Sequence, residues 1–186
     1  MKLSPSSATV KSSLRAPSLE ASRISTPIPA TNGKCILLAD DDLGARESLA
    51  AVLRRNGYLI LPARDGQEAL AFVGKRKVDL VLLDLNMPGK IGWDTFKRIA
   101  TENPLLPVII ITARRNQLFT ALAAGVGALL EKPLDIPALL KAITALLGES
   151  AETRLARVAG QRAAFVYQPA QERQSPPAGE RWGINE

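Results

Sequence analysis

Acidic, hydroxyl and basic side chains follow four apolar segments of this 186-residue chain, each at the point where the segment ends. They are Asp40, Asp41 and Asp42 after Ile36–Ala39, Asp84 after Leu80–Leu83, Thr112 after Val108–Ile111, and Lys132 after Leu129–Glu131. Short apolar runs bounded by turn residues are typical of buried strands. Because the carboxyl ends of parallel strands meet at one edge of a sheet, we expect these side chains to converge.

A cluster of this composition could bind a cation and a phosphoryl group. Carboxylates that lie together repel one another, so Asp40, Asp41 and Asp84 call for a counter-charge. Mg²⁺ suits two carboxylates, a backbone carbonyl and waters, because it prefers octahedral oxygen ligands. Lys132 would add a positive charge and Thr112 a hydroxyl donor, so the set could hold the three oxygens of a phosphoryl group on Asp84.

The elements that must position these residues alternate between strand and helix. Strands are predicted over Cys35–Ala39, Tyr58–Leu61, Leu80–Leu83, Val108–Ile111 and Ala128–Leu130. Helices are predicted over Leu43–Arg55, Gln67–Lys75, Trp93–Glu102, Gln117–Ala124 and Ile136–Leu147, the last with Asp135 as its N-cap. Strands rich in Ile, Leu and Val are covered on both faces. The pattern therefore predicts an α/β fold, a (βα)5 unit around a parallel sheet.

We expect a single domain over residues 34–148, flanked by two tails. Residues 1–33 are rich in Ser, Pro, Thr and Ala without periodicity, which is typical of a disordered arm. Residues 149–186 lose apolar density. A broken apolar stripe indicates a short helix over 151–166, with disorder after it.

Composition excludes several classes of function. The chain has no histidine, so it contains no histidine triad or histidine metal site and cannot be its own phosphohistidine donor. The single cysteine, Cys35, excludes an internal disulfide. The net charge of +6 is spread thinly and aromatic residues are 4% of the chain, so we do not expect it to bind nucleic acid. No apolar run is long enough to span a membrane, and we expect a cytoplasmic protein.

Residues 34–147 resemble the receiver domain of bacterial two-component response regulators. The resemblance rests on four motifs: Leu37–Asp42, Leu82–Gly89, Ile111–Ala113 and Glu131–Pro133. It implies a doubly wound, flavodoxin-like sheet with strand order 2-1-3-4-5. It also implies that a sensor histidine kinase or phosphotransfer protein donates a phosphoryl group to Asp84, and that the chain is no enzyme beyond its own phosphorylation and dephosphorylation at Asp84.

The resemblance also implies roles for the residues around Asp84. Asp41 and Asp84 would ligate Mg²⁺ directly, Asp40 through water, and Asn86 through its backbone carbonyl. Lys132 would neutralise the phosphoryl oxygens, and its bond to Pro133 would be cis.

A conformational switch is implied at Thr112 and at the position three residues before Lys132. A phosphoryl group on Asp84 would draw Thr112 and residues 113–116 toward it. Receivers couple that movement to an aromatic side chain at the second position, where this chain has Leu129. We expect a stand-alone receiver that signals to an unknown output protein through the face of its fourth helix, fifth strand and fifth helix, and this face could also form a homodimer.

Three alternatives remain open. A Mg²⁺-dependent phosphohydrolase would need a general acid two residues after the nucleophile, where this chain has Asn86. A nucleotide or flavin binder would need a glycine-rich loop after the first strand, where the run Asp40–Asp42 would repel phosphate. Transcriptional control through the tails would show as salt-dependent DNA binding.

Overall fold

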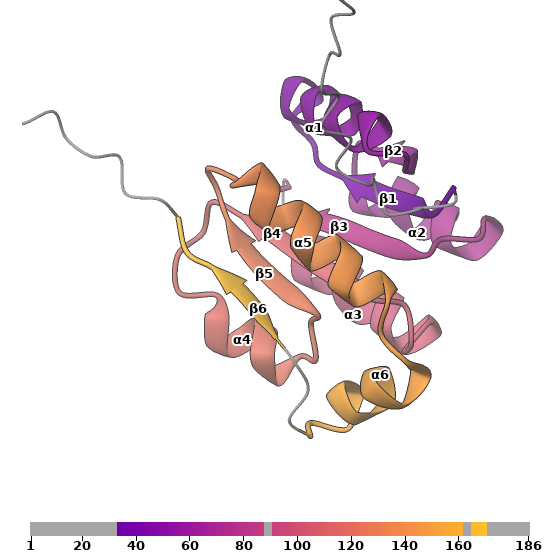
Figure 1. Cartoon of the computed structure of the whole chain (residues 1–186), viewed down its shortest axis with the longest axis vertical. Coiled ribbons are helices and arrows are strands. Elements are labelled where there is room, and N and C mark those ends of the chain that lie inside the picture. The colour runs from indigo at the N-terminus through magenta and orange to yellow at the C-terminus, as the bar shows by residue number, and fades with distance from the viewer. Residues whose placement is uncertain (1–32, 88–90, 162–164, 171–186) are drawn as a thin grey trace, which may run out of the picture.

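The computed structural model describes residues 33–87, 91–161 and 165–170, and within them strands and helices alternate as far as the fifth helix, after which a sixth helix and a sixth strand follow (Figure 1). The strands are β1 Cys35–Ala39, β2 Leu59–Ala63, β3 Leu80–Asp84, β4 Val108–Thr112, β5 Ala128–Glu131 and β6 Val166–Gln168. The helices are α1 Leu43–Arg55, α2 Gly66–Lys75, α3 Ile91–Glu102, α4 Leu118–Ala123, α5 Ile136–Leu147 and α6 Ala151–Val158. Residues 1–32 of the expected arm and all residues after 170 lie outside the described part of the chain.

The sheet confirms the predicted fold class. Its order is β2-β1-β3-β4-β5-β6, and each neighbouring pair runs parallel. The first five strands therefore have the order 2-1-3-4-5. The carboxyl ends of β1, β3, β4 and β5 lie at one edge, as parallel strands require.

Two apolar layers hold the sheet, because successive side chains of a strand point to opposite faces. Ile36 and Leu38 of β1 pack with α1 and α5, whereas Leu37 and Ala39 pack with α2, α3 and α4 on the other face (Figure 1). Every residue of β3 and β4 is buried. The residues before the site are therefore fixed by packing on both sides.

Aspartates cap the helices at the site edge. Asp42 accepts a hydrogen bond from the Ala45 N–H at the start of α1, and Asp135 accepts one from the Ala138 N–H at the start of α5. The N-cap predicted at Asp135 is confirmed. Asp42 thus has the capping role that a helix N-terminus favours.

Several predicted boundaries differ from the structure by one or two residues, and two elements differ most. The second strand begins at Leu59 and continues to Ala63, because it follows β1 to its last residue and Tyr58 instead packs into the core. The helix expected over 151–166 is shorter, since α6 ends at Val158. Gly160 follows with φ +70°, in the left-handed region that ends helices, and Val166 begins β6.

The described part of the chain contains no helix with the length and apolar content to cross a membrane.

Candidate functional site

Lys132 lies between two buried aspartates at the carboxyl edge of the sheet. Its Nζ donates to Asp84 Oδ2 at 2.6 Å and to Asp40 Oδ2 at 3.0 Å. The two aspartates are 3% and 4% exposed, so water screens these ion pairs little. Burial alone would lower the pKa of Lys132, but the hydrogen bonds and charges of Asp84 and Asp40 outweigh it and raise the pKa above its ordinary value. Lys132 is therefore a fixed positive charge at this edge.

Asp41 completes an acidic cluster with Asp40 and Asp84. Each of the three can offer a ligand atom within 4.8 Å of the others. Asp41 is exposed, which leaves an open side toward solvent. Mg²⁺ binds hard carboxylate oxygens and retains several waters, so the donor set and its open side fit this ion.

Asp84, Asn86 and Thr112 form a hydrogen-bonded chain beside this cluster. The Asn86 N–H donates to Asp84 Oδ1 at 2.7 Å. The Thr112 hydroxyl donates to Asn86 Oδ1 over a long 3.4 Å and accepts from the Arg114 N–H at 2.9 Å. Thr112 is fully buried at the end of β4. The Thr112 hydroxyl is therefore linked to Asp84 through Asn86, and only the bond that it donates is long.

Backbone contacts join the lysine to the threonine. The Lys132 N–H donates to the Thr112 carbonyl at 2.8 Å, and the Lys132–Pro133 peptide bond is cis, as the resemblance implied. The structure thus gathers the predicted aspartates, Thr112 and Lys132 at one edge, and it adds the side chain of Asn86 to them. Leu129 does not join them: it is fully buried in the apolar layer that faces α4, two residues before Glu131.

Two contacts near the site were not predicted from the sequence. The Arg46 guanidinium donates to the Asp40 carbonyl. A positive side chain in the first turn of a helix interacts unfavourably with the helix macrodipole. The position of Arg46 was therefore a sequence signal that its guanidinium has a hydrogen-bond acceptor nearby. The Glu131 carboxylate accepts from the Tyr167 hydroxyl and from the Ala170 N–H, both at 3.1 Å. No sequence pattern joins residues so far apart in the chain.

The fold and this edge define a class of protein. The family model described as "Response regulator receiver domain" matches residues 36–144, more than half of the chain, and the chain therefore belongs to that family. The resemblance found in the sequence is confirmed.

Solved structures and sequence relatives agree with this family. A CheY-like receiver domain protein from Methanospirillum hungatei has a TM-score of 0.58 and 28% identity, covering 62% of this chain and 94% of its own. The regulator TrrA from Thermotoga maritima, solved in complex with Mg²⁺ and BeF, has a TM-score of 0.57 and 30% identity, covering 61% and 98%.

Two relatives are longer than this chain. The transcriptional regulatory protein GlrR of Escherichia coli is 39% identical over 118 residues, which are 62% of this chain and 27% of GlrR. The response regulator MprA of Mycolicibacterium vanbaalenii is 37% identical over 114 residues, 60% of this chain and 49% of MprA. Because GlrR is a transcriptional regulator, the relatives conflict in part with our expectation that nucleic acid is not a partner.

Proposed function

We propose that this chain is a cytoplasmic phosphoacceptor of a two-component phosphorelay and that Asp84 receives the phosphoryl group. The observation that carries the proposal is the position of Lys132 Nζ, within hydrogen-bonding distance of both Asp84 and Asp40 and beside the acidic cluster. This arrangement combines a carboxylate nucleophile with a fixed cation that can neutralise charge on the group it accepts.

In the proposed reaction an Asp84 oxygen attacks the phosphorus of a phosphohistidine on the donor protein. An O–P bond forms, the P–N bond breaks, and the imidazole leaves with the electron pair. Lys132 would turn from the Asp84 oxygen to a phosphoryl oxygen. Thr112 would exchange its long bond to Asn86 for a phosphoryl oxygen, because a charged acceptor binds a hydroxyl more strongly than an amide does.

Asp41 and Asp84 are the residues we propose as direct Mg²⁺ ligands, with Asp40 acting through water and the Asn86 carbonyl as a further ligand. The ion would supply positive charge to the phosphoryl oxygens as they approach a carboxylate. The solved complex of TrrA with Mg²⁺ and BeF supports binding of this ion in the family, and the assignment of Asp40, Asp41 and Asp84 rests on their acidic cluster.

Covalent labelling tests the proposal. The full chain incubated with radiolabelled acetyl phosphate and Mg²⁺ should become labelled, and Asp84→Asn should lose the label because an amide cannot act as the nucleophile. Asp94→Asn, which changes an exposed aspartate in the first turn of α3, is the matched control and should label as the wild type does. Undiminished labelling of Asp84→Asn would refute the assignment, and EDTA should abolish labelling of the wild type if Mg²⁺ takes part.

The output is a second part of the proposal. A partner that recognises the face of α4, β5 and α5 is one candidate, and a homodimer through this face is a related one. Transcription, as in GlrR, is another, and salt-dependent binding of the full chain to DNA would distinguish it. The phosphohydrolase alternative loses support, because Asn86 carries an amide where a general acid would be needed.

A further inference from the structure

The segment 165–170 adds a strand to the sheet beside the candidate phosphoacceptor edge. Val166–Gln168 pairs in parallel with Ala128–Leu130, so β6 covers the edge that β5 would otherwise expose. In addition to the strand pairing, the Glu131 carboxylate accepts hydrogen bonds from the Tyr167 hydroxyl and from the Ala170 N–H of this segment. We call residues 165–170 the latch.

Glu131 connects the latch to the candidate site. It directly precedes Lys132, and it is the strand partner of Thr112. The Thr112 carbonyl also accepts the Lys132 N–H. In the proposed reaction, the hydrogen bonds of Thr112 and Lys132 change when Asp84 is phosphorylated. A displacement of Lys132 would reach Glu131 through the peptide bond between them, and a displacement of Thr112 would reach it through the strand pairing.

Besides the Glu131 contacts, the latch is held by its pairing with β5 and by the partial burial of Phe165 and Val166 against the two apolar layers. None of its residues is fully buried, and the hydrogen bond from the Val166 N–H to the Gly127 carbonyl is 3.5 Å long. Both the Nε2 and the Oε1 of Gln168 are buried without a hydrogen-bond partner in the described part of the chain. Their lost hydration makes the pairing of the latch with β5 less favourable. Short edge elements with few buried contacts open before the rest of a domain.

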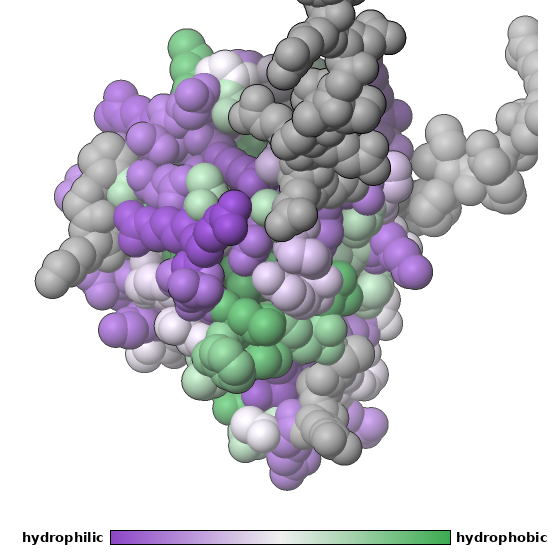
Figure 2. Space-filling model, turned by 90° about the vertical axis from the view of Figure 1, so that its left-hand side faces the viewer, coloured by the Kyte–Doolittle hydropathy of each residue, from purple (hydrophilic) through white to green (hydrophobic). Residues whose placement is uncertain are grey.

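The surface beside the latch is open to solvent and partly apolar. A hollow of about 490 Å³ separates α4 from the latch, and Arg115, Phe119 and Tyr167 line it. Figure 2 shows hydrophobic side chains gathered on the side of the molecule where α4 lies, and Phe119 of α4 is 82% exposed. Detachment of the latch would therefore enlarge a surface that is already suited to a protein partner.

We propose that the latch closes the β5 edge in the resting protein and that phosphorylation of Asp84 opens it by displacing Glu131. The occupant of this edge in the resting state is the chain's own C-terminal segment. Opening exposes the edge of β5 over Ala128–Leu130, to which a strand of an output partner can add. This inference rests on the proposed function.

Amide hydrogen exchange on the full chain, followed by mass spectrometry, tests the latch. Beryllofluoride with Mg²⁺ serves as the probe that mimics the phosphoryl group. Exchange over 165–170 should accelerate in the wild type and stay unchanged in Asp84→Asn. Without the probe, Tyr167→Phe should already accelerate exchange there by about three- to tenfold, because it loses one hydrogen bond to Glu131 and keeps the ring. Tyr58→Phe, in the core at the opposite end of the sheet, should leave residues 165–170 unchanged.

The outcomes separate the two proposals. If beryllofluoride alters exchange over 112–118 but not over 165–170, the latch is overturned and the phosphoacceptor assignment stands. If neither region responds, both fail. Equal opening in Asp84→Asn, or no response to Tyr167→Phe, would show that neither Asp84 nor the Glu131 contact governs this segment.

Discussion

Lys132 is the residue whose charge allows two aspartates to be buried side by side. Three carboxylates and one ammonium group at this edge leave two negative charges uncompensated, which favours a divalent cation. Without the ammonium group, the carboxylates of Asp40 and Asp84, in residues 4% and 3% exposed, would have no salt-bridge partner among the described residues. The lysine therefore contributes to folding as well as to the proposed chemistry.

Replacing Lys132 tests this dual role. Lys132→Met should lower the free energy of unfolding in EDTA by about 3 kcal/mol, because it breaks a buried pair and leaves the other charges unpaired. Mg²⁺ should restore part of the loss by supplying the missing positive charge. Urea titrations with and without Mg²⁺ measure both effects.

Lys34→Met is the matched control for that measurement. Lys34 pairs with Asp79 at 3.0 Å, but its side chain is 45% exposed. Water screens such a pair, so the loss should stay below about 1 kcal/mol and should not respond to Mg²⁺. Equal losses for the two lysines would contradict the account of the buried site.

At the scale of elements, close packing between α5 and the start of β5 positions Lys132. Gly127 directly precedes β5, and a Cβ added there would lie 2.8 Å from Leu146 Cδ1 and 3.2 Å from the Val108 carbonyl. Leu146 is buried in the apolar layer that α5 forms with the sheet. A larger residue at 127 would therefore separate the helix from the strand that ends at the site.

Two glycine substitutions measure that packing. Gly127→Ala should destabilise the protein by about 1–3 kcal/mol, since a methyl group inserted into a packed core forces its neighbours to move. Gly74→Ala in α2 has nothing within 4 Å of the added Cβ and should stabilise by up to about 1 kcal/mol through helix propensity. Thermal unfolding measures the change in melting temperature for both variants. A change of the same sign in both would contradict the steric explanation for Gly127.

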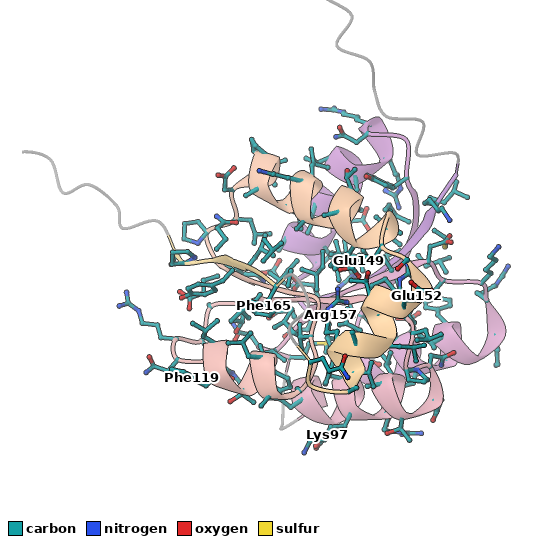
Figure 3. All side chains as sticks on the ribbon, turned by 60° about the horizontal axis from the view of Figure 1, so that its bottom comes forward. Lys97, Phe119, Glu149, Glu152, Arg157 and Phe165 are labelled. Atoms are coloured by element: carbon teal, nitrogen blue, oxygen red, sulfur yellow. The ribbon has the colours of Figure 1, made fainter. Side chains whose placement is uncertain are left out.

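At the scale of the whole molecule, one buried ion pair attaches α6 to the rest of the chain. Arg157 of α6 pairs with Glu149, which follows α5, and their side chains are 9% and 11% exposed. Figure 3 shows Arg157 directed from α6 toward Glu149, whereas Glu152 lies elsewhere on the helix. Arg154 adds hydrogen bonds to the carbonyls of Leu105 and Leu146. These contacts place the chain so that it can return to β5 as the latch.

Glutamine substitutions at two glutamates of this region test the attachment. Glu149→Gln should destabilise the protein by about 3 kcal/mol, because it leaves the Arg157 charge buried and unpaired. Glu152→Gln changes an exposed residue of the same type and should alter stability by less than about 0.5 kcal/mol. Urea unfolding distinguishes them, and a harmless Glu149→Gln would mean that apolar packing alone holds α6.

The strand-end residues could be predicted from the sequence because each depends on a local pattern, an apolar run followed by one polar residue. Periodicity likewise predicted the helices that pack on the sheet. The latch could not be predicted, because a three-residue strand has no measurable period and its hydrogen bond joins Tyr167 to a residue 36 positions away. The predicted end of α6 was also wrong, because the helix ends at Val158 and Val166 belongs to a strand of the sheet.

The two borders of the sheet differ in what they offer to a neighbouring molecule. At the β2 border, Pro62 lies opposite Leu38 and has no amide hydrogen. The row of backbone N–H donors along β2 is therefore interrupted for any strand that would pair with it. Self-association by continuous extension of the sheet would require both borders to accept a strand. We therefore expect the proline to disfavour fibre growth by sheet extension and to restrict strand addition to the opposite border.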